Sequence, residues 1–497
     1  MNLRAYAVLT LSSLAAAAGA QYSLGAATSG SWGSSAPYDA GLFTPFQDLN
    51  ALSLTEYTTL LHPHFPAHSV RVKQSRFCDG EVQAYSGYID VGARHLFFAF
   101  FESRRDPDQD DVIFWTNGGP GGSSMLGLYN ELGPCRVTGP NTTERFEYAW
   151  NNHANVFFVD QPIGVGFSYA DYGEKISTNA EAGQDIAAFF VIFFEHFTKF
   201  KGRPFHMAGE SFGGRYIPVF ASAVYDRNAD LVYAGLTPIN LTSVMIGNGD
   251  TNSVATMMSY YDVQCGSYGF PKVTSISDCV RMKQFVPRCQ KRLKESCVDV
   301  LDHIDCLDAW EFCQNSLTED IFTRRNPYDA LRPCLDKPDF ESCYPIVGDT
   351  TTYLNNRSVQ EALGIDPNHG NYTWANWEVN VRLNEDDRWF RAEHHLEALL
   401  QRGVKALIYV GDKDWICNWV RFVGNERMTL ELEWSGQDAF RSQPLRDWSV
   451  DGVVAGRTRS VGSLTFATIR DAGHMAPYDQ PVRTLEVVNR WLAGQEL

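Results

Sequence analysis

Short apolar runs that end in turn residues recur along the chain. Five are the clearest, at residues 112–116, 156–159, 205–208, 404–410 and 464–469. Segments of helical length, such as 182–197 and 481–492, lie between several of them. Nearly continuous apolar strands that alternate with helices predict a mostly parallel sheet with helices on both faces.

A polar or glycine-rich cluster follows each of these predicted strands. The clusters are residues 117–122, 160–162, 209–214, 411–414 and 471–474. The carboxyl ends of parallel strands share one edge of the sheet, and ligands and chemistry gather there. We therefore expect the functional site where these clusters meet.

Composition narrows the class of protein. The chain has 497 residues, of which 44% are hydrophobic, and this excludes global disorder. Its net charge of −17 disfavours nucleic acid or an anionic membrane as a partner. Eleven cysteines indicate an oxidising compartment, and the odd number leaves at least one thiol without an intrachain partner.

The N-terminus agrees with that compartment. Arg4 precedes an apolar stretch and small residues at 18–20, which predicts a signal peptide over residues 1–20. The sequence that follows predicts a flexible leader or removable pro-segment over residues 21–70. We expect secretion, with the vacuole as the alternative destination. Four sequons are candidate glycosylation sites: Asn141, Asn240, Asn356 and Asn371.

The remainder, residues 71–497, is predicted to be one catalytic domain. Eight of the eleven cysteines fall between Cys265 and Cys343, amid charged and loop-like sequence. This break in the pattern of strands and helices predicts a disulfide-rich cap, inserted at about residues 255–350.

The strongest catalytic motif is G-x-S-x-G at residues 209–213, between a predicted strand and a segment that can form a helix. Such a turn exposes the Ser211 hydroxyl, which needs a histidine to take its proton and a carboxylate to orient that histidine. Five histidines follow Ser211, and only His474 comes directly after a predicted core strand. Asp412 and Asp414 both follow the preceding strand, and spacing alone does not choose between them.

Several long segments together resemble the serine carboxypeptidase family. They are WTNGGPGGSS at 115–124, DQPIGVGFSY at 160–169, GESFGG at 209–214, GDKDWICNW at 411–419 and GHMAP at 473–477. The resemblance runs from Tyr85 to the C-terminus and is greatest to secreted or vacuolar fungal members. It implies an α/β-hydrolase fold and an enzyme that releases C-terminal amino acids from peptides and proteins through an acyl-enzyme.

The resemblance also implies a role for each matching residue. Ser211 would be the nucleophile, Asp414 the acid and His474 the base. The backbone amides of Gly119 and Phe212 would form the oxyanion hole. The remaining set would bind the end of the substrate, with Met475 in the leaving-residue pocket and the free carboxylate held by Trp115, Asn117, Glu131 and Glu210.

The two acids in that set predict a pH dependence. Two close carboxyls do not both ionise at low cost, so either Glu131 or Glu210 should keep its proton above the usual pKa. The protonated pair can donate a hydrogen bond to the substrate carboxylate, so peptidase activity should be best at acidic pH. From its sequence context alone, Glu131 would instead be a solvated charge at a helix end.

The chain departs from the family pattern at two positions. Many relatives have tyrosine at the position of Phe212 and a disulfide-bonded cysteine at the position of Gly122. We expect Cys78 and Cys135, which flank the same loop in sequence, to bond to each other. The family pattern implies four further bridges: Cys265–Cys279, Cys289–Cys313, Cys297–Cys306 and Cys334–Cys343. Cys417 would remain a free, non-catalytic thiol near the site.

Three other functions fit parts of the sequence. An esterase or acyltransferase of the same fold would share the triad, but the carboxylate-binding set favours the exopeptidase. The complete Ser, Asp and His set disfavours a catalytically dead adhesion protein, and a cysteine protease centred on Cys417 has no adjacent histidine motif. The sequence contains no metal cluster, Walker loop or dinucleotide fingerprint, so we expect no cofactor and no metal.

Overall fold

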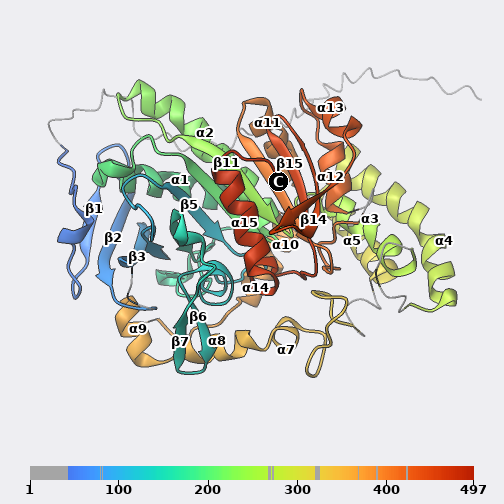
Figure 1. Ribbon diagram of the computed structural model, residues 1–497, viewed down its shortest axis with the longest axis horizontal. Coiled ribbons are helices and arrows are strands. Elements are labelled where there is room, and N and C mark those ends of the chain that lie inside the picture. Colours follow the sequence, from blue (N-terminus) through green and yellow to red (C-terminus); the bar gives the residue numbers. More distant parts are fainter. Residues whose placement is uncertain are drawn as a thin grey trace, which may run out of the picture. The chain divides into compact units, whose positions relative to one another are not determined.

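The computed structural model describes residues 43–497, except 79, 81, 267–269, 271–273, 301, 319–324, 368, 388–389 and 421–423. The predicted signal peptide and the first part of the predicted leader lie outside these residues. The main sheet has the order β1-β2-β3-β4-β8-β5-β10-β11-β12-β15-β14-β13, with β9 paired to β4 (Figure 1). Its strands are β1 (Thr58–Leu61), β2 (His68–Ser75), β3 (Ala84–Val91), β4 (Arg94–Phe101), β5 (Asp111–Thr116), β8 (Ala154–Val159), β9 (Tyr169–Ala170), β10 (Phe205–Glu210), β11 (Leu241–Gly247), β12 (Lys405–Gly411), β13 (Arg446–Val450), β14 (Val453–Val461) and β15 (Leu464–Ile469).

Helices and a small hairpin complete the described chain. The hairpin pairs β6 (Cys135–Gly139) with β7 (Thr142–Arg145). The helices are α1 (Asn179–His196), α2 (Gly213–Tyr233), α3 (Ser253–Cys265), α4 (Ile276–Leu293), α5 (His303–Leu317), α7 (Phe340–Cys343), α8 (Ile346–Leu354), α9 (Arg357–Leu363), α10 (Trp377–Asp386), α11 (Ala392–Gln401), α12 (Asn425–Glu431), α13 (Gln437–Ser442), α14 (Ala476–Asp479) and α15 (Pro481–Leu492). Short helical turns are η2 (Leu49–Ala51), η3 (Gly127–Leu132), η4 (Trp150–Asn152), η5 (Asp171–Gly173), η6 (Thr198–Phe200) and η7 (Lys294–Asp299). None of the described helices is long and apolar enough to cross a membrane.

The centre of the sheet is parallel, from β8 through β5, β10, β11 and β12 to β15. Strands β8, β10 and β15 are buried at every position. This burial explains their apolar sequences, because a strand covered on both faces has no side that faces water. The pairing of Gly209 with Thr116 and of Gly247 with Tyr409 brings the carboxyl ends of these strands to one edge.

Alternate residues of the central strands contact different layers of helix. The Phe114 ring on β5 lies 5.8 Å from Phe190 of α1, between ring centroids. The next residue, Trp115, belongs to a core cluster on the other face, which includes Val487 of α15. Helix α15 crosses the front of the sheet in Figure 1. The predicted α/β architecture is confirmed in this central region, with antiparallel strands added at both edges.

Strands β1 and β2 lie within the range predicted as a leader. They pair antiparallel with each other, and β2 pairs with β3. Leu60, Val70 and Val72 are buried. The ordered sheet therefore begins before residue 71. These strands alternate between buried and more exposed positions, which is a weaker signal than a continuous apolar run. Removal of a pro-segment remains a prediction.

Between β11 and β12 the chain leaves the sheet for a long, mainly helical stretch that contains the predicted insertion. Helices α3, α4 and α5 pack around their own apolar cluster, which includes Met282, Leu293 and Leu317. In Figure 1 these helices lie at the end of the sheet opposite β1, and α7, α8 and α9 run along its lower side. Within the stretch, Ala330 N donates to Lys413 O at 2.9 Å and Pro327 O accepts from Trp415 N at 3.2 Å, which ties these residues to the loop after β12.

Four of the five expected disulfides are present, and the fifth is not. The bonded pairs are Cys78–Cys135, Cys265–Cys279, Cys297–Cys306 and Cys334–Cys343. The expected Cys289–Cys313 bond is absent, and both cysteines are buried free thiols. They form a hydrogen bond to each other between α4 and α5. Packing of the two helices brings the thiols together without a covalent link.

Candidate active site

Ser211 occupies a sharp turn between β10 and α2. Its backbone φ is +62°, in the left-handed region that non-glycine residues rarely adopt. Three backbone hydrogen bonds hold the turn: Ser211 N donates to Gly247 O at 3.1 Å, and Ser211 O accepts from Gly214 N and Asp250 N, each at 2.9 Å. Because the side chain is only half-buried, the hydroxyl is held at the carboxyl edge of the sheet and remains accessible.

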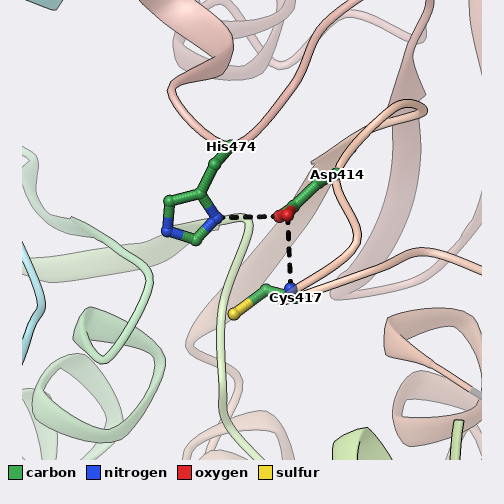
Figure 2. Close-up of side chains that lie close together, drawn as sticks. All are labelled: Asp414, Cys417 and His474. Carbon is green, nitrogen blue, oxygen red and sulfur yellow. Dashed lines mark hydrogen bonds and ion pairs between the residues drawn. The ribbon is translucent and has the colours of Figure 1, made fainter. Parts of the chain in front are cut away.

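Asp414 and His474 meet at the same edge, after β12 and β15. His474 Nδ1 donates to Asp414 Oδ2 at 2.9 Å, and both side chains are buried (Figure 2). The other ring nitrogen of His474, Nε2, points away from Asp414 in Figure 2. Asp412 has different contacts, because it accepts from Asp471 N at 2.7 Å and pairs with Lys413. The structure therefore pairs His474 with Asp414 and not with Asp412.

The loop after β5 packs against the Ser211 turn. A Cβ atom on Gly118 would lie 2.3 Å from Phe212 N, so only glycine allows this approach. Gly119 has a φ of +113°, which again favours glycine. Among the described residues, no acceptor takes a hydrogen bond from the amide of Gly119 or of Phe212. Both donors are free to bind an oxyanion beside Ser211.

The position of the missing family disulfide is occupied by backbone pairing. Gly122 forms an isolated antiparallel bridge with Ala375. Beside it, Ser123 N donates to Trp374 O at 2.8 Å. The glycine-rich loop is therefore tied to the segment before α10 by hydrogen bonds in place of a covalent bond.

Four buried side chains are linked by hydrogen bonds into a row that ends at Glu210, the residue before Ser211. Trp115 Nε1 and Gly127 N donate to Asn117 Oδ1, at 2.7 and 3.0 Å. These two bonds turn the amide so that Asn117 Nδ2 donates to Glu131 Oε1 at 2.9 Å. Glu131 in turn hydrogen-bonds to Glu210, the residue before Ser211. The chain of contacts brings together the whole set that the family resemblance assigned to the substrate carboxylate.

The two glutamates are strongly shielded from water. Glu131 is 1% exposed and Glu210 is 3% exposed. Glu131 is therefore not the solvated helix-end charge that its sequence context indicated. Burial raises the pKa of Glu131, and burial together with the negative charge of Glu131 raises the pKa of Glu210 well above its usual value. Two carboxyl groups can share a hydrogen bond only while one of them holds a proton, and these pKa shifts keep it there.

An apolar and aromatic wall adjoins His474. Met475 is fully buried in a cluster with Tyr344, and Tyr328 packs against the same cluster. Tyr328 O accepts a hydrogen bond from His474 N at 2.8 Å, and its ring centroid lies 5.5 Å from that of the imidazole. Sequence reasoning missed Tyr328 and Tyr344, since both lie within the predicted cap, where no motif marks them.

Cys417 lies beside the catalytic pair. Its backbone N donates to Asp414 Oδ1 at 3.3 Å, and the thiol is buried (Figure 2). Potential ligand atoms of Asp414, Cys417 and His474 lie within 4.8 Å of one another. Burial, and then the charge of Asp414, raise the pKa of the Cys417 thiol well above its usual value, so the sulfur is a protonated and weak nucleophile. Cys417 therefore lies beside Asp414 and His474 without the low pKa that activates a thiol.

Arg136 and Asn248 are two further polar residues that sequence reasoning missed. Arg136 Nη2 donates to the backbone oxygen of Glu131 at 3.0 Å, and burial lowers the pKa of Arg136 to about 10. Asn248 Nδ2 donates to Asp414 Oδ2 at 2.8 Å. The sequence did carry a signal for Asn248, because it is a polar residue between two glycines directly after a buried strand.

A serine on a strained strand-to-helix turn, with an Asp–His pair at the neighbouring strand ends, is the arrangement of a serine hydrolase with the α/β-hydrolase fold. The order of the three residues along the chain is also the order of that fold, with the serine first and the histidine last. The fold and the site thus define the class of the enzyme.

Comparison with known proteins identifies the family. A family model described as "Serine carboxypeptidase" matches residues 77–494, so the chain belongs to the serine carboxypeptidase family. Carboxypeptidase Y homolog A of Pyricularia oryzae is 41% identical over 421 residues, which are 83% of this chain and 73% of that protein. Carboxypeptidase Y of Komagataella phaffii is 39% identical over 415 residues, which are 82% of this chain and 76% of that protein. The protein is a serine-type carboxypeptidase, and an esterase or acyltransferase activity is not favoured.

A solved structure shares the fold. It is Kex1(delta)p, a prohormone-processing carboxypeptidase from Saccharomyces cerevisiae, with a TM-score of 0.69 and 23% sequence identity. The match covers 83% of this chain and 91% of that one. At this level of identity the comparison supports the α/β-hydrolase fold alone.

Proposed function

We propose that this carboxypeptidase cleaves the last peptide bond of its substrates with Ser211 as nucleophile, His474 as general base and Asp414 as the group that orients His474. The observation that carries the proposal is the position of the buried Glu131–Glu210 pair, which is joined to the nucleophile through the adjacent residue 210. A carboxyl pair that keeps a proton is a donor for a terminal carboxylate, and it lies one residue from the serine.

The first half of the reaction forms an acyl-enzyme. Ser211 Oγ attacks the carbonyl carbon of the last peptide bond while His474 Nε2 takes the hydroxyl proton. Asp414, which accepts a hydrogen bond from His474 Nδ1, stabilises the imidazolium that results. The negative charge moves to the carbonyl oxygen, where the amides of Gly119 and Phe212 donate to it. Collapse of this intermediate breaks the C–N bond, and the leaving amine takes the proton from His474.

The second half returns the enzyme to its starting state. A water molecule gives a proton to His474 Nε2 and attacks the ester carbonyl of the acyl-enzyme. The ester C–O bond then breaks, and Ser211 Oγ regains the proton from His474. The products are the free C-terminal amino acid and the shortened peptide, which has a new terminal carboxylate.

The site selects chain ends through the terminal carboxylate. The protonated Glu131–Glu210 pair and the Asn117 amide donate hydrogen bonds to it, and Met475 borders the side chain of the leaving residue. Hydrogen bonds to a charged group contribute about 1.5–3 kcal/mol each. An internal peptide bond offers no carboxylate at this place, so the set favours exopeptidase over endopeptidase cleavage.

A mixed peptide library tests the proposed function. The library is incubated with the enzyme at several pH values, and the products are sequenced. We expect stepwise loss of residues from the C-terminus, and no loss at acidic pH from the same peptides with an amidated C-terminus. Frequent internal cuts, or equal cleavage of the amidated peptides, would contradict the assignment of the carboxylate-binding set.

Replacement of Cys417 by serine is expected to reduce kcat only modestly, by less than about 10-fold, because the protonated thiol takes no part in the reaction. We expect bulky mercurials to inhibit the parent enzyme by modifying the Cys417 sulfur beside Asp414 and His474, and the same variant should lose this sensitivity. Steady-state kinetics with and without the mercurial measure both effects. A complete loss of turnover in Cys417→Ser would show that the thiol takes part in the reaction.

We also propose that the enzyme enters the secretory pathway and acts outside the cell, with the vacuole as the alternative. A signal peptide over residues 1–20, a catalytic domain over 71–497 and a cap over about 255–350 remain parts of this proposal. Three of the sequon asparagines, Asn141, Asn240 and Asn371, have exposed side chains, and Asn356 is half-buried at the start of α9. Exposure of this kind supports glycosylation of the first three sites, and Asn356 stays part of the proposal on its sequon alone.

A further inference from the structure

Asn248 has an unusual number of contacts with the catalytic loops. Its side-chain Nδ2 donates to Asp414 Oδ2 at 2.8 Å and to Gly473 O at 3.1 Å. Its Oδ1 accepts from Gly411 N at 3.3 Å, and its backbone N donates to Tyr409 O at 2.8 Å. One fully buried amide thus binds the loop of the acid and the loop of the histidine together.

The backbone at this position suits asparagine. Residue 248 has a φ of +46°, a left-handed conformation that asparagine, aspartate and glycine tolerate better than other residues. It comes directly after β11, the strand between the nucleophile's strand β10 and the acid's strand β12. The preceding residue, Gly247, also accepts the hydrogen bond from Ser211 N. The turn after β11 therefore contacts all three catalytic loops.

Asp414 Oδ2 receives two hydrogen bonds, one from His474 Nδ1 and one from Asn248 Nδ2. Oδ1 receives one more from Cys417 N. A buried carboxylate without such donors would be costly to keep ionised and free to rotate away from the imidazole. The amide of Asn248 supplies a donor that carries no charge and does not titrate.

We propose that Asn248 is a positioning residue for catalysis, which holds Asp414 aligned with His474 and fixes the histidine loop through Gly473. The inference rests on the proposed roles of Asp414 and His474 and adds a fourth member to that set. Asn248 acts through Asp414, so its loss should lower kcat and leave KM nearly unchanged.

The first test replaces Asn248 by glycine, which removes the amide and accepts the φ of +46° without strain. An N-blocked amino-acid ester is the substrate, because it has no free carboxylate and is insensitive to the Glu131–Glu210 pair. We expect kcat to fall about 10- to 100-fold, the effect of losing a hydrogen bond to a charged group, with KM within about twofold of the parent value.

The second test replaces Asn248 by aspartate, which keeps the shape and tolerates the same φ. Beside Asp414, the introduced carboxyl shares one proton with it, and burial and like charge raise the pKa of that shared proton above the usual range. Below this pKa the protonated carboxyl donates in place of the amide, and activity on the ester is retained. As the pH rises through this pKa, the introduced carboxylate no longer donates to Asp414 and repels it, and activity is lost at a pH where the parent is active.

Other ionisable groups face this spot and are common to parent and variants. They are His474, Cys417, Glu210, Asp250, Tyr328, Asp329 and Tyr344. The parent profile includes these groups without the introduced carboxyl, so the difference between the Asn248→Asp and parent profiles reports the introduced group and its effect on its neighbours.

Asn252→Ala is the matched control. This asparagine is four residues further on and caps α3, with Oδ1 accepting from Ala255 N at 3.0 Å. We expect Asn252→Ala to have a lower melting temperature than the parent. Its kcat per folded enzyme and its pH profile should equal those of the parent. If Asn248→Gly kept the parent kcat, or if the Asn248→Asp profile matched the parent profile, Asn248 would be only structural. An error in the proposed triad would give a different result, because activity would then survive in Ser211→Ala.

Discussion

Ser211→Ala is expected to lower kcat by about 10⁶-fold on peptide and ester substrates alike, the effect seen when the catalytic serine of a triad is removed. Without the hydroxyl no acyl-enzyme forms, and His474 has no proton to take. The oxyanion donors at Gly119 and Phe212 remain, so a residual rate above that of water is expected. Steady-state kinetics at substrate saturation measure the loss, and release of one product in a burst tests for the acyl-enzyme.

Ser222→Ala provides the comparison. Ser222 is a buried serine on α2, the helix that follows Ser211, and its hydroxyl has no hydrogen-bond partner among the described residues. We expect this variant to retain the parent kcat. His474→Ala should lose about as much activity as Ser211→Ala, and the double variant little more, because the two residues act as a unit. More than about one per cent of the parent activity in Ser211→Ala would assign the nucleophile elsewhere.

The second large effect is a pH profile that differs between two kinds of substrate. The pKa values of Glu131 and Glu210 are raised, so the pair holds its proton below the raised value and loses it as the pH increases through it. Ionisation removes a donor and adds a negative charge opposite the substrate carboxylate. We expect kcat/KM for peptides to fall about 10- to 100-fold across this transition, mainly through KM, because one hydrogen bond to a charged group is lost.

Esters and amides without a free carboxylate should keep their activity to higher pH. Glu210→Gln removes the titrating proton but keeps an N–H donor, so the alkaline fall on peptides should be smaller in this variant. Glu195→Gln is the control, because Glu195 is a buried acid on α1 that pairs with Lys201 at 2.6 Å, away from the site. Its profiles should match those of the parent. Identical profiles for peptides and esters in the parent enzyme would remove the proposed role of the pair.

The sequence alone was sufficient for the central sheet and for the exposed turn at Ser211. The apolar runs before Ser211 and His474 are strands β10 and β15, and the segment predicted as a helix at 481–492 is α15. The glycines around Ser211 already indicated a tight turn. These features could be predicted because hydrophobic periodicity and turn chemistry depend on residues close together in the chain.

Other features depended on residues that are distant in sequence. The choice of Asp414 over Asp412 follows from contact with His474, 60 positions away, and was available beforehand only through family resemblance. Burial of Glu131, contact of Tyr328 with His474, and the separate thiols of Cys289 and Cys313 had no local signal.

Asn248 shows the distinction most clearly. The sequence showed that Asn248 follows a buried strand. It did not show the hydrogen bond from its side chain to the backbone oxygen of Gly473, which lies 225 positions away. The sequence by itself determined which segments form the sheet and where the serine is exposed, since both follow from local pattern. Only the tertiary structure decided which polar groups share the carboxyl edge and in what protonation state, because burial and long-range contacts set hydrogen bonding and pKa together.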